Sequence, residues 1–128
     1  MQKTLLILCT LVFSLSSIKA QYAGGQLGPD ILEAILTGDS DAFSPIVDRR
    51  TDYVQGANFI VSSPTQILIQ LKDFFRQHPC SSVRVLNQGA SKDFAFVRTD
   101  YKDISGQTFW ITLFVRAKRI SRIKIERQ

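Results

Sequence analysis

The segment from Ser63 to Pro79 constrains the fold most, because its start, its apolar face and its end are all visible in the sequence. Ser63 followed by Pro64 is typical of a helix N-terminus, and Gln66 is spaced to complete a capping box with Ser63. The residue before a proline is disfavoured in a helix, so the helix should end at His78. Between these limits, apolar residues recur at helical spacing and predict one buried face. They are Ile67, Leu68, Leu71, Phe74 and Phe75.

The sequence after this helix is typical of β-strands. Four runs rich in β-branched and aromatic residues cover 82–90, 93–102, 108–118 and 120–127. We expect them to form a curved antiparallel sheet that covers the helix, with a bulge at Gly89 that bends it. In the third run every second residue is apolar, so that face should pack on the helices. These residues are Phe109, Ile111, Leu113 and Val115.

Shorter elements precede the central helix. Residues 29–37 predict a helix that ends at Gly38 and turns its apolar residues to the core, namely Ile31, Leu32, Ile35 and Leu36. Residues 41–47 predict a second, shorter helix, and 48–52 a polar connection in solvent. Residues 53–61 predict two short strands around a turn at Gly56.

Residues 1–20 have the features of a cleavable secretion signal. A lysine precedes an apolar run that is too short to span a membrane, and the segment ends in the small residue Ala20. We therefore expect an exported protein, periplasmic or extracellular, without a transmembrane segment after cleavage; an uncleaved anchor is the alternative. Residues 21–28 are glycine-rich and predict a flexible leader, and 29–128 predict a single domain.

Residue types that form catalytic and metal sites are scarce in this sequence. Cys80 is the one cysteine outside the predicted signal, so it is either an inert thiol or an intermolecular bridge. His78 is the one histidine, and its place at a helix end is more typical of a cap than of a catalytic base. Zinc sites need several Cys or His ligands, and no acidic run has calcium-binding spacing. We expect no catalytic residue, no metal and no cofactor.

The order of the predicted elements resembles the nuclear transport factor 2-like cone, an α+β fold in which a bent sheet wraps a long helix. The run SSPTQILIQLKDFFRQHPCSSVRVLNQGASKD is similar to the signature of a family of small secreted bacterial proteins called domain of unknown function 4783. That signature joins an FF-x-x-HP helix end to an N-x-G-x-S-K-D strand end. Here these residues are Phe74, Phe75, His78, Pro79, Asn87, Gly89, Ser91, Lys92 and Asp93. The resemblance implies the cone fold and export, and it implies no activity.

Two groups of residues are candidates for a site. Cones of this superfamily can hold a small ligand in their interior, and the resemblance directs that role to Asp52, Tyr53, Asp100 and Tyr101. The alternative places the aspartates in turns and the tyrosines at the edge of the core. The second group lies opposite the apolar face of the third strand and comprises Trp110, Thr112, Phe114 and Arg116. Aromatic residues on a polar strand face often mark a protein interface, although the leader or a loop is an equal candidate to cover them.

Positive charge gathers in the last two predicted strands, in a chain of formal net charge +5. The residues are Arg116, Lys118, Arg119, Arg122, Lys124 and Arg127. Charged strand faces commonly prevent unwanted edge pairing, and the alternative is an anionic partner such as an envelope polymer. We expect no nucleic-acid partner for an exported protein.

Together these observations predict an exported, non-enzymatic binding or assembly module that acts through the sheet face or the cone cavity. Its partner would be an unknown protein or small ligand, and a homodimer would join through Trp110 and Phe114. The alternative is a small-ligand enzyme or carrier that uses the interior of the cone.

Overall fold

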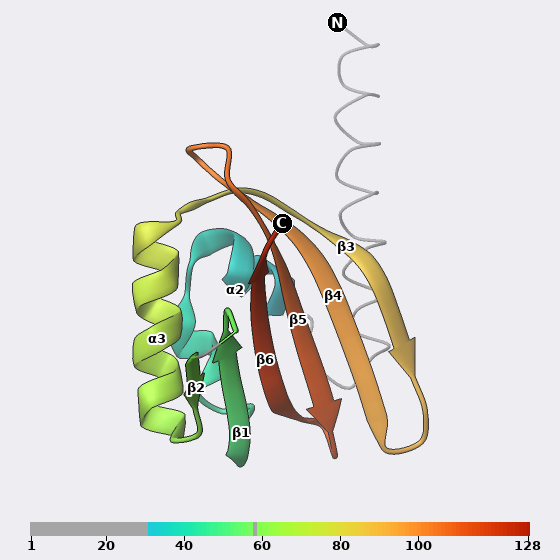
Figure 1. Ribbon diagram of the computed structural model, residues 1–128. Helices are drawn as coiled ribbons and strands as arrows, with labels where there is room; N and C mark the ends of the chain where they lie inside the picture. The colour runs from blue at the N-terminus through green and yellow to red at the C-terminus, as the bar shows by residue number, and fades with distance from the viewer. Residues whose placement is uncertain (1–30, 58) are drawn as a thin grey trace, which may run out of the picture.

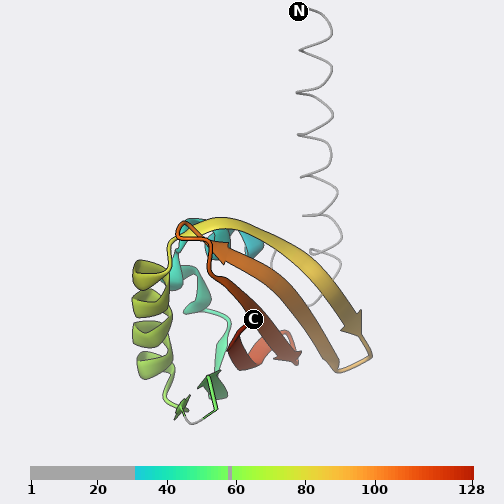
Figure 2. The same cartoon turned by 45° about the horizontal axis from the view of Figure 1, so that its top comes forward.

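The structure is a computed structural model that describes residues 31–57 and 59–128; the predicted signal, the leader and residues 29–30 lie outside this part. One curved six-stranded sheet carries the helices on one of its faces (Figures 1 and 2), in the strand order β2-β1-β6-β5-β4-β3. The elements in chain order are α2 (Ile31–Thr37), the 3-10 helix η1 (Ser40–Phe43), β1 (Val47–Gln55), β2 (Phe59–Val61), α3 (Pro64–Gln77), β3 (Cys80–Ala90), β4 (Phe94–Asp103), β5 (Thr108–Arg116) and β6 (Arg119–Arg127). The predicted α+β architecture is confirmed.

Helix α3 matches the prediction in its limits and in its buried face. Its stripe is buried at Ile67, Leu71, Phe74 and Phe75, and Leu68 packs against the same core. Ser63 occupies the N-cap position, but its side chain makes no capping hydrogen bond, so the predicted capping box is wrong. The Ser63 carbonyl instead accepts the amide of Ile67 at 2.8 Å, and Pro64 has no amide to satisfy. Backbone geometry therefore sets the helix start.

Helix α2 ends in a Schellman motif. Gly38 has a φ of 72°, its amide donates to the carbonyl of Ile35, and the amide of Asp39 donates to the carbonyl of Ala34. A Cβ on Gly38 would lie 3.3 Å from the Cβ of Phe75, so the glycine also lets α2 approach α3 closely. The buried face contains Ala34 rather than Leu36, which is 44% exposed, so that part of the prediction is wrong.

The segment 48–52 is part of strand β1 and not the predicted connection in solvent. Thr51 is fully buried, and its hydroxyl donates to the carbonyl of Ile120. Strand β1 pairs antiparallel with β2 and parallel with β6, so the sheet is mixed, whereas the four long strands are antiparallel as predicted. The helical stretch predicted over 41–47 is correspondingly shorter, because η1 stops at Phe43 and β1 begins at Val47.

The irregularities that bend the sheet lie beside the predicted positions. Gly89 pairs regularly with Phe96. The register of β3 shifts between Cys80 and Ser82 and again between Val85 and Asn87, so the bulge nearest to the glycine is at Leu86. The β5–β6 turn consists of Ala117 and Lys118, with φ of 52° and 64°, so the break predicted at Arg119 lies two residues earlier. Two successive residues with positive φ are typical of the type I′ hairpin turn.

The core fills the space between the helices and the inner face of the sheet. The inward residues of β5 are at most 6% exposed, and Tyr53 and Tyr101 are fully buried among them. Phe74 packs edge to face on Phe109, with ring centroids 5.1 Å apart. In the part of the chain that the structure describes, no helix combines the length and apolar character needed to cross a membrane.

Candidate functional site: an aromatic pocket on the open face of the sheet

The face of the sheet opposite the helices, here called the open face, carries the side chains that alternate along each strand with those of the core. The register places residues from five strands in one row across it: Gly89 of β3, Phe96 of β4, Phe114 of β5, Arg122 of β6 and Asp52 of β1. A second row begins at Phe94, which pairs with Arg116, which in turn pairs with Arg119. Cross-strand partners share a face of the sheet, so each residue is adjacent to the next one in its row.

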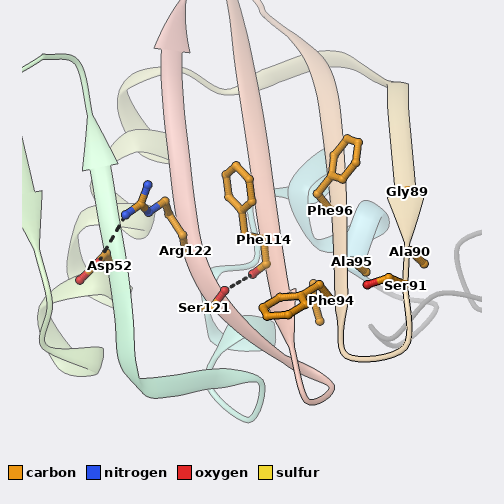
Figure 3. A pocket seen from close by; sticks show the side chains of 11 residues that line it. Asp52, Gly89, Ala90, Ser91, Phe94, Ala95, Phe96, Phe114, Ser121 and Arg122 are labelled. Carbon is orange, nitrogen blue, oxygen red and sulfur yellow. Dashed lines mark hydrogen bonds and ion pairs between the residues drawn. The ribbon is translucent and has the colours of Figure 1, made fainter.

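The first row, together with Phe94 of the second, borders an open pocket of about 520 Å³. Figure 3 shows the rings of Phe94, Phe96 and Phe114 projecting from the same side of β4 and β5, with Asp52 and Arg122 at the far side. The complete lining is Asp52, Gly89, Ala90, Ser91, Phe94, Ala95, Phe96, Phe114, Val115, Ser121 and Arg122. The volume falls in the range of about 300–1,000 Å³ that is usual for small-molecule sites.

Two local features of the strands shape the pocket. A Cβ on Gly89 would come within 2.7 Å of the Phe96 ring, so the glycine gives that ring the space to lie across β3. On the other side, the β5–β6 register shifts between Phe114 and Val115, which leaves Ser121 as an extra residue in β6. The Ser121 hydroxyl donates to the carbonyl of Phe114 at 3.2 Å (Figure 3).

Three arginines of the open face have partners of two kinds. Arg122 lies 3.8 Å from one carboxylate oxygen of Asp52, and the other oxygen accepts a hydrogen bond from the hydroxyl of Ser62 at 3.0 Å. Arg116 and Arg98 stack on rings instead: the guanidinium of Arg116 is 5.6 Å from the Phe94 centroid, and that of Arg98 is 4.3 Å from Trp110. The Nε of Arg98 is buried without a hydrogen-bond partner among the described residues.

The four residues proposed for a cone cavity lie on two different faces. Tyr53 and Tyr101 are in the core, where burial raises the pKa of both hydroxyls. The Tyr53 hydroxyl donates to Gln55 at 2.8 Å, and that of Tyr101 donates to the carbonyl of His78. Asp52 and Asp100 are on the open face, where Asp100 accepts from Arg84 at 3.3 Å and from Gln128 at 2.6 Å. Only Asp52 of the four borders the pocket.

Of the four residues proposed for an interface, Phe114 lines the pocket and is 36% exposed. Trp110 and Arg116 are on the same face, whereas Thr112 is buried between its cross-strand neighbours on β4 and β6. Among the other lining residues, Asp52 was a cavity candidate and Arg122 belongs to the positively charged group, whereas sequence reasoning missed Phe94 and Phe96. The alternation of Phe94 and Phe96 along β4 was visible, but their meeting with Phe114 and Gly89 depends on strand register.

His78 and Asp103 form a pair at the opposite end of the sheet. The two side chains are 2.9 Å apart, and the His78 ring packs against Phe74 and Phe109. The other oxygen of Asp103 accepts hydrogen bonds from the amide and hydroxyl of Ser105 and the amide of Gln107. The hydrogen bond from the Ser105 hydroxyl does most to lower the pKa of Asp103 to about 2, and those from His78 and from the amides of Gln107 and Ser105 add to it. The pair therefore ties the β4–β5 turn to the end of α3.

Cys80 begins β3, beside the end of α3. It is half-buried, and burial raises the pKa of its thiol, although a hydrogen bond with Tyr101 acts in the other direction. A raised pKa keeps the thiol protonated and a poor nucleophile at neutral pH. Across residues 31–57 and 59–128, no three His, Cys, Asp or Glu side chains cluster in a way that could hold a metal ion.

Comparison with solved structures defines the class of this fold. An NTF-2 like protein of unknown function from Silicibacter pomeroyi is 15% identical, covers 94% of this chain and 98% of its own, and superposes with a TM-score of 0.57. At such low identity the likeness shows the fold alone, which is the α+β cone of the nuclear transport factor 2-like class.

The family model described as Domain of unknown function (DUF4783) matches residues 29–126, and the chain belongs to this family. Two solved members are similar to it. The Bacteroides uniformis protein is 19% identical, with 77% of this chain and 94% of that chain covered and a TM-score of 0.69. The Bacteroides ovatus protein is 20% identical, with 77% and 92% covered and a TM-score of 0.68. No curated protein matches the sequence.

Proposed function

We propose that this protein is an exported, non-enzymatic binding or assembly module that acts through the open face of its sheet. One observation carries the proposal: three phenylalanine rings and a pocket of about 520 Å³ lie on a face that no described helix covers. Large rings left in water make no contribution to the core, and an apolar hollow rimmed by polar residues is typical of a binding surface.

The alternative of an enzyme or carrier that uses the cone interior is not favoured. Tyr53, Tyr101, Ile67 and Leu71 fill the space under the sheet, each at most 1% exposed. Both tyrosine hydroxyls are already hydrogen-bonded within the protein, and their raised pKa keeps them protonated at neutral pH, so neither can act as a general base.

The sequence of residues 1–20 has the features of a secretion signal and supports export. The protein would then act in the periplasm or outside the cell. The mature protein would then begin at Gln21. Mass spectrometry of the protein recovered outside the cytoplasm measures its N-terminus directly, and a chain that still begins at Met1 or Gln2 would contradict processing at this site.

If the protein acts as an assembly module, we expect it to form a homodimer through the open face. A two-fold axis near Trp110 and Phe114 would bring the same rings of two copies together, as an isologous interface requires. Replacing both residues, as Trp110→Ser with Phe114→Lys, should convert the dimer to a folded monomer, because a central aromatic is worth about 2 kcal/mol or more. Sedimentation equilibrium decides this: a wild-type monomer at roughly 50 μM rules out a dimer of useful strength.

A partner of another kind is tested by affinity capture with a matched pair of variants. Phe114→Lys places a charge on the open face, and Ile69→Lys makes the same type of change at a residue of α3 that is 52% exposed. We expect a specific partner to be retained by the wild type and by Ile69→Lys, and to be lost with Phe114→Lys. Equal recovery with all three would show that the open face is not the binding surface.

A further inference from the structure

The floor of the pocket is apolar, and two cations lie just outside its lining. The floor consists of Phe94, Phe96 and Phe114. Arg116 is the cross-strand partner of Phe94, and Arg119 is directly opposite Arg116 in the antiparallel ladder, so two like charges share one face at close range. Such a pair is destabilising by itself.

Carboxylates balance most of the other cations on this face. Arg84 pairs with Asp100, Lys124 with Glu126, and Arg122 with Asp52. Arg116 and Arg119 differ, because neither has a carboxylate of the described residues within ion-pair distance, and both are exposed. The two guanidinium groups therefore form an unbalanced positive site at the rim of an apolar pocket.

The Phe94 ring fixes where one of these charges lies. Arg116 stacks over the ring, with its guanidinium carbon 5.6 Å from the centroid. A guanidinium that lies on an aromatic ring keeps the N–H donors along its edge free for an acceptor in its own plane. Carboxylates match that edge with two parallel hydrogen bonds. Arg116 thus places its donors within reach of an anion that also contacts the phenylalanine floor.

We propose that this pocket binds a small organic acid with an apolar body. The carboxylate lies between Arg116 and Arg119 and relieves their repulsion, and the apolar body covers Phe94, Phe96 and Phe114. This inference rests on the proposed function, since it names the ligand of the same open face. The pocket of about 520 Å³ has room for one such molecule, with the head group outward.

The test is a competition experiment on the full protein at about 1 μM, below the concentration at which a weak dimer would form. The fluorescent probe 8-anilinonaphthalene-1-sulfonate combines an apolar body with an anionic group, and octanoate should displace it. Octan-1-ol supplies the apolar body alone, and acetate the anion alone; we expect each to displace the probe at least about tenfold more weakly, because a charged hydrogen bond is worth that much.

Two double variants locate the site. In Arg116→Gln with Arg119→Gln, the dissociation constant of octanoate should rise about tenfold or more. The matched control is Lys72→Gln with Arg76→Gln, which removes two exposed charges from α3 beside a second hollow of about 360 Å³ and should leave octanoate binding within about twofold. Near-ultraviolet circular dichroism verifies that both variants are folded.

Each contrary result has its own meaning. Displacement by octan-1-ol as strong as by octanoate, or unchanged octanoate binding in Arg116→Gln with Arg119→Gln, overturns the organic-acid ligand and leaves the open face as a binding surface. Loss of binding in the α3 control moves the site to the helix side, which overturns this inference and counts against the proposed function as well.

Discussion

Both faces of strands β4 and β5 carry large apolar side chains, but the two sets differ in how much they are exposed to solvent. On the inner face, Phe109 and Leu113 are 6% and 0% exposed beneath the helices. On the open face, Phe94 and Phe114 are 55% and 36% exposed. Burial of the inner residues stabilises the fold, whereas the open-face rings contribute little until something covers them. The same strands therefore separate residues that hold the protein together from residues available to a partner.

The largest effect should come from the core beneath the inner face. Phe74 of α3 is 2% exposed, and its ring centroid lies 5.5 Å from that of Tyr101 and 5.1 Å from that of Phe109 on the inner face. Phe74→Ala should lower the free energy of unfolding by about 3–5 kcal/mol, because it removes buried area and leaves a cavity. Denaturant unfolding measures the change. A loss below about 1 kcal/mol would mean that the inner face is not the tightly packed side of this comparison.

An intermediate effect should appear only in acid. The pKa of Asp103 is about 2 in the folded protein, against an ordinary value of 3.8, because the folded state stabilises the charged carboxylate. The contribution is fully present above about pH 5 and is lost as the pH falls from there through 3.8 towards 2. Thermal unfolding between pH 6 and pH 2 should therefore show a steeper acid loss in the wild type than in Asp103→Asn. If the wild type and Asp103→Asn lost stability equally as the pH falls, Asp103 would not contribute to the acid sensitivity of the fold.

The smallest effect should come from the open face. Phe114→Lys should change the free energy of unfolding by no more than about 0.5 kcal/mol, because the ring is partly in solvent and the long lysine stem can follow the sheet surface. The same denaturant titration applies. A loss of about 2 kcal/mol or more would show that Phe114 stabilises the fold as the inner-face residues do, and would contradict the difference between the two faces.

The sequence predicts those parts of the fold whose signals are local. The N-terminal residues of α3, its apolar face and the proline after it are all visible in the local sequence. Likewise, the alternation of apolar residues in β5 assigns each residue to a face. Strand β1 was hidden because Asp48, Arg49 and Arg50 make its first half polar, and because it pairs with β6, far along the chain. Its pairing is a tertiary property, as Thr51 bonding to Ile120 illustrates.

The candidate site shows the same division. Phe114 was predicted on the open face from alternation alone, and the structure places it at the pocket. Gly89 lies opposite Phe96 because of a register that follows the bulge at Leu86, and a one-residue shift of β3 would have sent Gly89 to the other face. Bulges leave no dependable sequence pattern, so a site assembled across five strands could not be derived from any one of them.

The place of β6 in the sheet has a consequence for how the protein is made. This strand lies between β1 and β5, yet it is the last of the described strands to leave the ribosome. Until it emerges, the β2–β1 hairpin and the β5-β4-β3 meander are separate pieces, each with an unpaired edge next to the missing strand. The nascent chain is therefore held short of its native state until β6 has been made, and in that interval both pieces expose an unpaired strand edge.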